Sequence, residues 1–247
     1  MNSIEVWQDN VRQMSEDSKL VSSFRCMDLV RSIPLYEVHE YNGYLNFAKK
    51  IYQEQTDTWM PNWKLAMTND PRGYNRCPAF FTKDSVRVYD INSSTTNIKC
   101  NHHYYTYNLN TKKDILDFDR IVELGGGCGD MAKFIRNMGF RGEYIIIDLP
   151  EILKIQDYNL HGYDVELTTS TIPYKDNTLF ISTWALSECP MDWRHKVISE
   201  LNPQNYLITY QRNFQGISNE EYFKDWGGIR IDIPWIHWDG GSKYLLK

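Results

Sequence analysis

The stretch DRIVELGGGCGDMAKFIRNMG, residues 119–139, decides the fold class of this chain. Four glycines fall within residues 125–129, between an apolar run that predicts a strand (RIVEL, 120–124) and an amphipathic run that predicts a helix. A glycine-rich turn between a strand and a helix presents backbone N–H groups, and the missing Cβ atoms let a ligand approach the backbone closely. The turn is therefore interpreted as a seat for a nucleotide-like cofactor.

Short apolar runs alternate with helical runs through the second half of the chain. The predicted strands cover residues 120–124, 144–148, 164–168, 177–186 and 205–210. The predicted helices run from Asp130 to about Met138, from Pro150 to about Asn159 and from Met191 to Leu201. IRIDIPWIHW, the turn DGG and SKYLLK predict a terminal hairpin. Strands separated by helices indicate an α/β fold, doubly wound, with a parallel sheet and right-handed crossovers.

The first 118 residues have a different pattern and predict an α-rich cap. Apolar positions near a 3.6-residue period predict two helices within residues 4–33 and a third over residues 44–52. Residues 60–111 are rich in Asn and Tyr and contain several prolines, so we expect irregular structure with short strands such as SVRVYDI, 85–91. The expected domains are a substrate-binding cap, residues 1–118, and a cofactor-binding core, residues 119–247.

Composition and charge limit the classes of partner. Hydrophobic residues make up 42% of the chain and aromatic residues 14%, which argues against disorder. The formal charge of −5 would repel a polyanion, so no nucleic-acid partner is expected. The five cysteines form no CxxC pair and are interpreted as reduced thiols. Neither a signal peptide nor a membrane span is expected, and the sequence predicts a cytoplasmic protein.

Three kinds of nucleotide site compete for the glycine-rich turn. A phosphate-binding P-loop requires Lys-Ser or Lys-Thr after its last glycine, and none follows Gly129. A dinucleotide site is supported by GCGDMA, 127–132, but only 118 residues follow Gly129 and the strands end in a hairpin. Asp148 lies nineteen residues beyond Gly129, close to the spacing at which a second strand delivers a carboxylate to ribose hydroxyls.

The third kind is a site for S-adenosylmethionine. VELGGGCGD resembles motif I of the class I methyltransferases, with Glu123, Gly125, Gly127 and Gly129 on the family positions. The resemblance implies that Glu123 helps to organise the site for the methionine part and its cationic amine. It also implies a Rossmann-like core whose mostly parallel, seven-stranded sheet ends in an antiparallel hairpin after five parallel strands.

Each of these features also has a simpler structural explanation. The glycines could form only a tight connection, Asp148 could cap the next helix, and Glu123 could be a surface charge. The glycine-rich turn, Asp148 and Glu123 occur together at the family spacing, and this combination favours a methyltransferase. An NAD(P)-dependent oxidoreductase and a catalytically silent nucleotide-binding module remain the alternatives.

Two further segments resemble O-methyltransferases. IIIDLPEIL, 145–153, is similar to their second-strand segment, which implies that Asp148 binds the ribose and that Leu149 adjoins it. IPYKDNTLFISTWALSECPMDW, 172–193, is similar to their third-to-fourth strand region, and the cofactor contacts that this resemblance implies are Ser170 and Ile172 beside the adenine and Trp184 nearby. Plant phenol O-methyltransferases carry Leu-His-Asp at the end of the fourth strand. This chain has Leu-Ser-Glu at 186–188, so the histidine base of that branch is absent.

GGGCGD, IIDLPE and WALSE together resemble the sugar O-methyltransferases of bacterial and large-virus glycan gene sets. The chain also resembles the methyltransferase part of multidomain glycan-building proteins of chlorella viruses, which implies a deoxyhexose such as rhamnose as the acceptor. Aromatic residues of the cap could stack on a pyranose or simply pack in a core. These residues are Tyr41, Tyr44, Trp59, Trp63, Tyr74, Tyr104 and Tyr105.

Methyl transfer to a sugar hydroxyl benefits from a group that accepts the hydroxyl proton. We expect Glu188 to be this base or to bind the acceptor hydroxyl, because it follows the fourth predicted strand and Trp184 and Pro190 could bury it. A charge at a helix N-terminus or a partner for Arg194 is the simpler explanation of Glu188. His103 is the alternative base, followed by His237. No group of residues has the spacing of metal ligands, so transfer without a metal is expected.

Overall fold

The structure is a computed structural model that describes residues 38–54, 60–68, 86–93, 95–233 and 241–247. The chain divides into two compact units. The helical unit comprises the described residues up to His102 together with Gly127–Gly139 and Pro150–Tyr163. The sheet unit comprises His103–Gly126, Phe140–Leu149 and Asp164–Lys247. The expected boundary between residues 118 and 119 stays a prediction.

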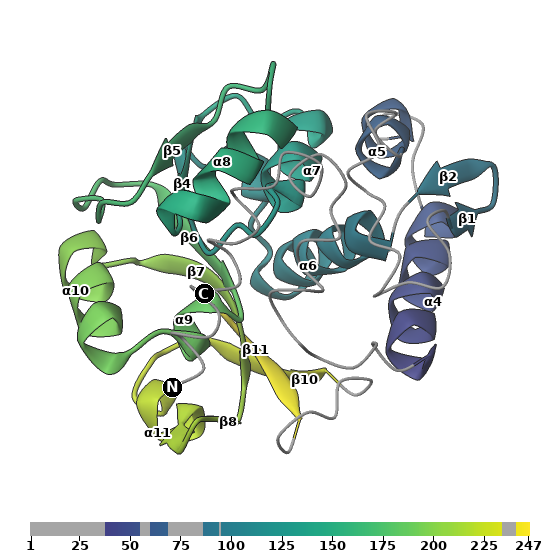
Figure 1. Ribbon diagram of the computed structural model, residues 1–247. Coiled ribbons are helices and arrows are strands. Elements are labelled where there is room, and N and C mark those ends of the chain that lie inside the picture. The colour runs from purple at the N-terminus through teal and green to yellow at the C-terminus, as the bar shows by residue number, and fades with distance from the viewer. Residues whose placement is uncertain (1–37, 55–59, 69–85, 94, 234–240) are drawn as a thin grey trace. The chain divides into compact units, whose positions relative to one another are not determined.

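The sheet unit is built on seven strands in the order β10-β11-β7-β6-β3-β4-β5 (Figure 1). Five neighbouring strands, from β5 to β7, are parallel; β11 is antiparallel to β7, and β10 is antiparallel to β11. The strands are β3 (Arg120–Leu124), β4 (Glu143–Ile147), β5 (Glu166–Thr168), β6 (Thr178–Thr183), β7 (Asn205–Gln211), β10 (Ile229–Ile233) and β11 (Ser242–Leu246). The expected Rossmann-like α/β fold, with a mostly parallel seven-stranded sheet that ends in an antiparallel hairpin, is confirmed.

The central strands are apolar along their length because both of their faces are buried. All five residues of β3 are buried, as are the last four of β4 and the first five of β6. Parallel strands covered on both faces have nearly continuous runs of β-branched and other apolar residues, which is why strands could be recognised at residues 120–124 and 144–148.

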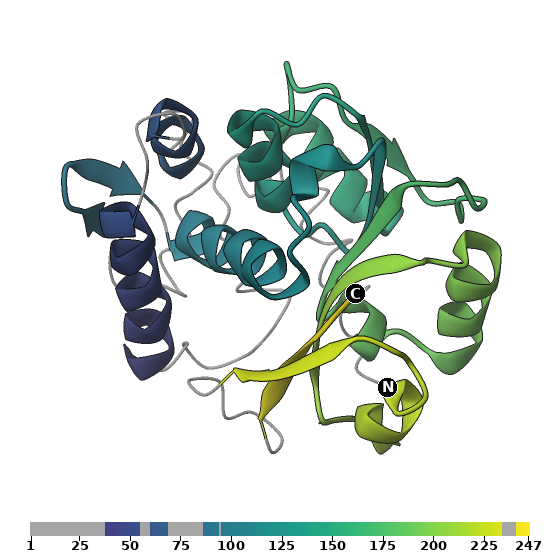
Figure 2. The same ribbon diagram turned by 180° about the vertical axis from the view of Figure 1, so that it is seen from behind.

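Three helices and one face of the sheet form a core within the sheet unit. The helices are α9 (Ala185–Glu188), α10 (Met191–Leu201) and α11 (Asn219–Phe223). Alternate strand residues, among them Val122, Ile145, Phe180 and Ile208, cluster with Val197 and with other apolar side chains of these helices. The opposite face carries the intervening residues, such as Glu123 and Tyr144. Figure 2 shows the same sheet from behind, with the yellow C-terminal strands beside the green β7.

The helical unit contains helices and one small hairpin. Its elements are α4 (Val38–Glu54), α5 (Met60–Met67), the antiparallel pair β1 (Val86–Val88) and β2 (Ile91–Ser93), α7 (Asp130–Met138) and α8 (Pro150–Asn159). Helix α5 packs against α7, and the buried Trp63 donates its indole N–H to Asn101 Oδ1 at 2.9 Å. Helix α6 (Thr95–Thr111) crosses the boundary of the units between His102 and His103. The short elements η1 (Ile115–Asp117), β8 (Asn213–Phe214) and β9 (Ile217–Ser218) belong to the sheet unit.

Most of the predicted elements are confirmed, and two predictions are wrong. Helix α4 contains the helix expected over residues 44–52, and α7, α8 and α10 begin and end where the sequence predicts. The expectation of largely irregular structure over residues 60–111 is wrong, because α5 and α6 lie there, whereas the short strands expected near residues 85–91 are confirmed by β1 and β2. Residues 100–107 of α6 are all buried, so the helix has no polar face and no amphipathic period. The helices expected within residues 4–33 lie outside the described residues.

The sequence also predicts too long a strand over residues 177–186. Strand β6 ends at Thr183, and α9 begins at Ala185 after a turn at Trp184. The backbone N–H of Leu186 donates to Ser182 Oγ at 2.8 Å, so a side chain of the strand caps the short helix. Apolar periodicity alone does not separate a strand from a helix that follows it directly.

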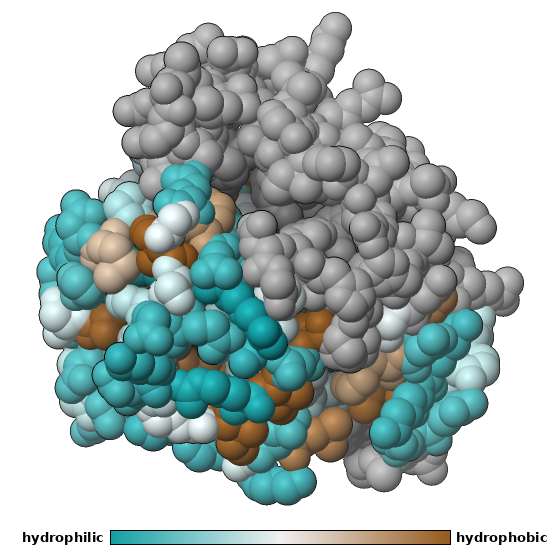
Figure 3. Space-filling model, turned by 90° about the horizontal axis from the view of Figure 1, so that it is seen from below, coloured by the Kyte–Doolittle hydropathy of each residue, from teal (hydrophilic) through white to brown (hydrophobic). Residues whose placement is uncertain are grey.

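Hydrophobic residues at the described surface lie among hydrophilic ones. Figure 3 shows this mixture on the face that it draws. The large exposed hydrophobic residues of the described chain are Leu65, Tyr89, Leu109, Tyr158, Tyr174 and Ile229. Isolated exposed apolar side chains of this kind are normal for a folded protein and assign no docking surface.

Candidate functional site

The glycine-rich turn begins where the strand order of the sheet reverses. From β3 the chain adds β4 and β5 on one side, and β6 and β7 on the other. Ligands of doubly wound sheets bind outside the carboxyl ends of the strands at such a reversal. Gly125 directly follows β3, and its N–H donates to the carbonyl of Ile147 at the end of β4 at 2.9 Å.

Gly125 and Gly126 are held by packing within the sheet unit. Gly125 has φ +73°, and a Cβ placed there would lie 2.1 Å from Ala185 Cβ at the start of α9. A Cβ on Gly126 would lie 2.8 Å from the Ile146 side chain and 3.3 Å from Glu123 Cδ. Both distances are too short for a side chain, so these two glycines are required by the protein's own neighbours.

Gly127 and Gly129 belong to the helical unit and have different surroundings. Gly129 has φ +85°, and its Cβ would lie 2.8 Å from the Leu160 side chain. Gly127 has φ +56°, and its Cβ would meet nothing within 4 Å. Packing therefore accounts for the missing side chain at three of the four glycines, and Gly127 faces open space. The predicted contacts of Gly125, Gly127 and Gly129 with a cofactor stay a prediction.

Two amides of α8 orient the peptides of the turn. Gln156 Nε2 donates to the Gly127 carbonyl at 2.9 Å, and Asn159 Nδ2 donates to the Cys128 carbonyl at 3.3 Å. In a trans peptide the C=O and the following N–H point in opposite directions. The N–H groups of Cys128 and Gly129 consequently point away from α8.

Glu123 is a buried carboxylate on β3, with 1% of its surface exposed. The Tyr144 hydroxyl on β4 donates to Glu123 Oε2 at 2.8 Å. The Cδ atom of Glu123 would lie 3.3 Å from a Cβ placed on Gly126. The simpler explanation of Glu123 as a surface charge is therefore wrong. A buried carboxylate requires partners, and the Tyr144 hydroxyl is one of them.

Asp148 and Leu149 follow the end of β4 and are both partly exposed. The Asp148 N–H donates to the Thr168 carbonyl at 3.1 Å, and Asp148 Oδ1 accepts from the Leu149 N–H at 2.9 Å. The carboxylate is thus fixed at the carboxyl end of the second strand. Its predicted contact with a ribose stays a prediction.

The two residues expected beside an adenine follow β5. Ser170 is exposed, and its N–H donates to Thr168 Oγ1 at 3.0 Å. Ile172 is partly buried against the core of the sheet unit. Both lie in the chain segment that joins β5 to β6.

Trp184 lies at the turn between β6 and α9. Its φ of +69° is unusual for a bulky residue, and strain of this kind is often found at functional sites. The Trp184 N–H donates to the Thr209 carbonyl at 2.9 Å, and its indole N–H donates to Ser242 Oγ at 3.4 Å. The backbone of Trp184 is therefore bound to β7, and its ring is bound to β11.

Glu188 is the last residue of α9 rather than part of the fourth strand, and it is exposed. The expected burial by Trp184 and Pro190 is wrong, because the chain turns at Trp184 before it reaches Glu188. Gln211 Nε2 donates to Glu188 Oε1 at 3.3 Å. Burial raises the pKa of the neighbouring Cys189 thiol to about 12, and the carboxylates of Glu188 and Asp148 add to this rise. Both carboxylates therefore act on the same sulfur atom.

The two adjacent histidines of α6 have separate environments. His102 belongs to the helical unit, where its ring contacts Tyr44 and Phe47 edge-on, and burial lowers its pKa to about 3. His103 belongs to the sheet unit and is 3% exposed. His103 Nδ1 lies 2.6 Å from the Tyr244 hydroxyl, and its ring also contacts Trp184.

The other expected residues contribute less to the site. Tyr44, Trp63, Tyr104 and Tyr105 are buried, which favours packing over stacking on a sugar. Trp59, Tyr74 and His237, and the side chain of Tyr41, lie outside the described residues. Over the described ranges, no three His, Cys, Asp or Glu side chains are grouped so that they could hold a metal ion. No described helix is long and apolar enough to cross a membrane.

Sequence reasoning missed the residues that hold the site residues in place. Tyr144, Gln211 and Tyr244 bind Glu123, Glu188 and His103, and none belongs to a motif. Each is distant in the chain from the residue that it binds, so only the tertiary structure brings them together.

No family model and no curated protein matches the chain. Solved structures with similar coordinates include the pyocyanin biosynthetic protein PhzM, at 13% identity and a TM-score of 0.43. That alignment covers 61% of this chain and 55% of PhzM, so this chain spans little more than half of that protein's length. The YcgJ protein from Bacillus subtilis aligns at 12% identity and a TM-score of 0.42, over 54% of this chain and 70% of that chain. A SAM-dependent methyltransferase from Aquifex aeolicus aligns at 13% identity and a TM-score of 0.37, over 51% of this chain and 79% of that one.

Proposed function

We propose that this chain is an S-adenosylmethionine-dependent O-methyltransferase that acts on a sugar hydroxyl. The observation that carries the proposal is the position of the glycine-rich turn: it follows β3 at the reversal of strand order, with Glu123 and Asp148 at the ends of neighbouring strands. The sheet then ends in the antiparallel pair β10 and β11 instead of a second parallel half, which favours this cofactor over a dinucleotide.

The residues present fit the parts of S-adenosylmethionine. Asp148 offers an acceptor-only group to the two ribose hydroxyls, and Leu149, Ser170 and Ile172 would flank the adenine. Gly125, Gly127 and Gly129 shape the turn, and the open space beside Gly127 leaves room for close approach. Glu123 supports the turn near the methionine part, and Trp184 adjoins the cofactor. The bound cofactor would supply an electrophilic methyl group on a sulfonium.

Glu188 is the proposed partner of the acceptor hydroxyl. The exposed carboxylate can accept a hydrogen bond from a sugar hydroxyl and take its proton as the new O–C bond forms. Such a base contributes about 10²–10⁴-fold to the rate. His103 is the second candidate, but it is buried and its Nδ1 lies 2.6 Å from the Tyr244 hydroxyl.

Isothermal titration with S-adenosylhomocysteine and with NADH tests the cofactor. We expect S-adenosylhomocysteine alone to bind, and Asp148→Asn to weaken its affinity at least about 10-fold, which corresponds to one charge-assisted hydrogen bond. Asp157→Asn, on an exposed residue of α8, is the matched control and should bind normally. Binding of NADH alone would make the chain an oxidoreductase, and binding of neither compound would reject both assignments.

Transfer of a labelled methyl group to a panel of glycans, rhamnosides included, tests the acceptor. We expect Glu188→Gln to lower kcat about 10²-fold or more, while Glu221→Gln, an exposed residue of α11, leaves kcat unchanged. Loss of turnover in His103→Ala with full activity in Glu188→Gln would move the base to His103. Methylation of proteins or small phenols in place of every glycan would refute the sugar acceptor.

A further inference from the structure

A buried polar network surrounds the short helix that carries Glu188. All members of this network are buried: Ser187 of α9, Arg194 of α10, Gln211 of β7 and Asn219 of α11. Buried polar groups of this number are retained only when they satisfy one another. The network therefore fixes the position of α9 relative to β7, α10 and α11 within the sheet unit.

Arg194 of α10 binds the backbone on both sides of Glu188. Its NH2 group donates to the Ser187 carbonyl at 2.6 Å and its Nε to the Cys189 carbonyl at 2.8 Å. Its NH1 group donates to Asn219 Oδ1 at 2.7 Å. Burial lowers the pKa of the guanidinium, but arginine remains charged at neutral pH. Glu188 therefore lies between two residues whose backbone carbonyls are both bound by Arg194.

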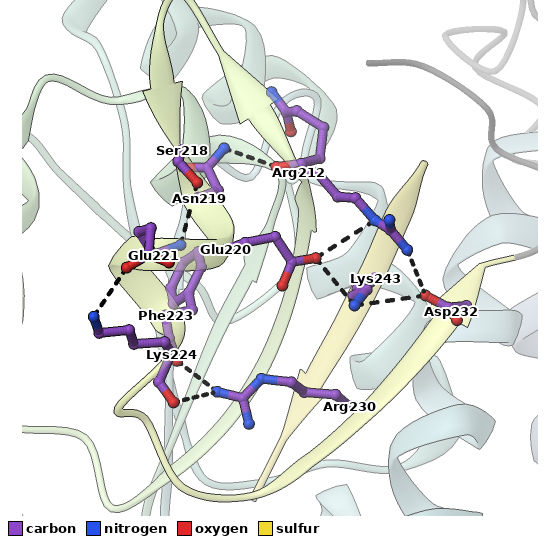
Figure 4. Close-up of polar contacts among 11 residues, drawn as sticks. Arg212, Ser218, Asn219, Glu220, Glu221, Phe223, Lys224, Arg230, Asp232 and Lys243 are labelled. Atoms are coloured by element: carbon purple, nitrogen blue, oxygen red, sulfur yellow. Dashed lines mark hydrogen bonds and ion pairs between the residues drawn. The ribbon is translucent and has the colours of Figure 1, made fainter. Parts of the chain in front are cut away.

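Asn219 connects this clamp to β7. Its Nδ2 donates to the Gln211 carbonyl at 2.8 Å, and its backbone N–H donates to the Arg212 carbonyl at 2.8 Å (Figure 4). Figure 4 also shows ion pairs that join Arg212, Glu220, Lys243 and Asp232. These side chains are partly exposed, and exposed ion pairs add little stability. The buried amide contacts are therefore what hold the end of β7 against α9.

Gln211 is the member of the network that reaches the Glu188 carboxylate. Ser187 Oγ lies 2.9 Å from Gln211 Oε1 and 2.6 Å from the Trp184 carbonyl. With Oε1 turned to the serine hydroxyl, Nε2 faces Glu188 Oε1 at 3.3 Å. The opposite amide orientation would set two acceptor oxygens against each other while Glu188 is ionised.

From these contacts we propose that Gln211 is a positioning residue that holds the Glu188 carboxylate ionised and aimed at the acceptor hydroxyl. The proposal rests on the proposed function for the role of Glu188. A hydrogen bond to the charged form of a carboxylate favours that form. The titratable groups that interact electrostatically with Glu188 include the Arg194 cation, which also favours ionisation, and the Cys189 thiol. The Asp148 carboxylate acts on the same thiol.

Carbon-13 NMR of protein labelled at the glutamate carboxyl tests the contact without any turnover. The Glu188 signal is assigned by its absence from Glu188→Gln. We expect the titration midpoint of Glu188 to rise by about one pH unit in Gln211→Met and further in Gln211→Glu, where a like charge replaces the donor. Ser187→Ala, which frees the amide to turn, should give a smaller rise. Gln204→Met, on an exposed glutamine, is the control and should not shift the midpoint.

The pH profile of methyl transfer provides the second readout. In Gln211→Met the acid limb of kcat/KM should move upward by the same interval, while the affinity for S-adenosylhomocysteine stays within about 2-fold. An unchanged midpoint in Gln211→Met, or an equal rise in Gln204→Met, would overturn the proposal. Wild-type protein that binds no S-adenosylhomocysteine would reject the proposed function instead, and the NMR titration would still decide the Gln211 contact.

Discussion

Gly127 is the residue of the glycine-rich turn whose side-chain position is open. Its three neighbouring glycines abut Ala185, Ile146 and Leu160, whereas a Cβ on Gly127 would meet nothing within 4 Å. Its requirement for glycine therefore comes from its positive φ and, in the proposed function, from the cofactor that approaches it. These two causes can be separated because Gly162 has φ +87° and equally open surroundings.

Gly127→Ala and Gly162→Ala form a matched pair. We expect each to lower the free energy of unfolding by about 1–2 kcal/mol, because a left-handed backbone strains an L-residue with a Cβ. Only Gly127→Ala should weaken S-adenosylhomocysteine binding, by about 10-fold or more, through the added methyl group. Urea unfolding and isothermal titration measure the two effects. Equal affinities in the two variants would remove Gly127 from the cofactor site.

At the scale of the element, α6 shows how one helix can serve two environments. His102 lies in the helical unit against α4, and His103 lies in the sheet unit against Tyr244 and Trp184. Adjacent side chains of a helix point in different directions, so one dipeptide contributes to two cores. Because burial lowers the pKa of His102 to about 3, its environment in the helical unit should affect how stability depends on pH.

His102 should make stability depend on pH. Its pKa is about 3 in the folded chain against 6.5 for the ordinary group, so between these values the unfolded chain binds the extra proton. Stability is then full above pH 6.5 and is lost as the pH falls toward 3. From pH 7 to pH 5 we expect the wild type to lose roughly 2 kcal/mol more than His102→Phe, in which the ring remains and the titration is removed. Urea unfolding at both pH values measures this difference, with the exposed His161→Gln as control. The same pH dependence in wild type and His102→Phe would contradict the explanation.

At the scale of the whole molecule, strand pairing brings together groups that are far apart in the chain. Glu123 lies in β3, Asp148 follows β4 and Trp184 follows β6, and these three strands are neighbours in the sheet although up to sixty residues separate the three side chains in the chain. A ligand that binds these groups together binds only the folded chain. It should therefore stabilise the fold by mass action.

S-adenosylhomocysteine should raise the melting temperature of the chain. At a free concentration of 100 Kd the stabilisation is about 2.7 kcal/mol. In a chain of this size that corresponds to a rise of roughly 5–10 °C. A thermal-shift titration measures it, and Asp148→Asn at the same concentration should give a smaller rise. No rise in the wild type, or a rise with NADH instead, would contradict the proposed cofactor.

The sequence by itself determined most strands of the seven-stranded sheet, the helices α7, α8 and α10, and the position of the glycine-rich turn. The apolar runs of β3 and β4 and the ends of α7, α8 and α10 could be predicted, because burial on both faces and local helix signals leave a pattern in the chain. The fold class followed from the alternation of these runs. Helix α6 could not be predicted, since its middle, residues 100–107, is buried on all sides and shows no amphipathic period.

Only the tertiary structure decided which groups surround the candidate site residues. The contacts of Tyr144 with Glu123, Gln211 with Glu188 and Tyr244 with His103 join residues 21, 23 and 141 positions apart. The pairing of β3 with β4 creates the first contact, and the packing of α9 and α6 against strands creates the other two. No local sequence pattern specifies either arrangement. The exposure of Glu188 was decided in the same way, because a turn at Trp184 replaces the last residues of the expected strand. Local sequence specifies what each segment can form, whereas burial and partners depend on which segments become neighbours.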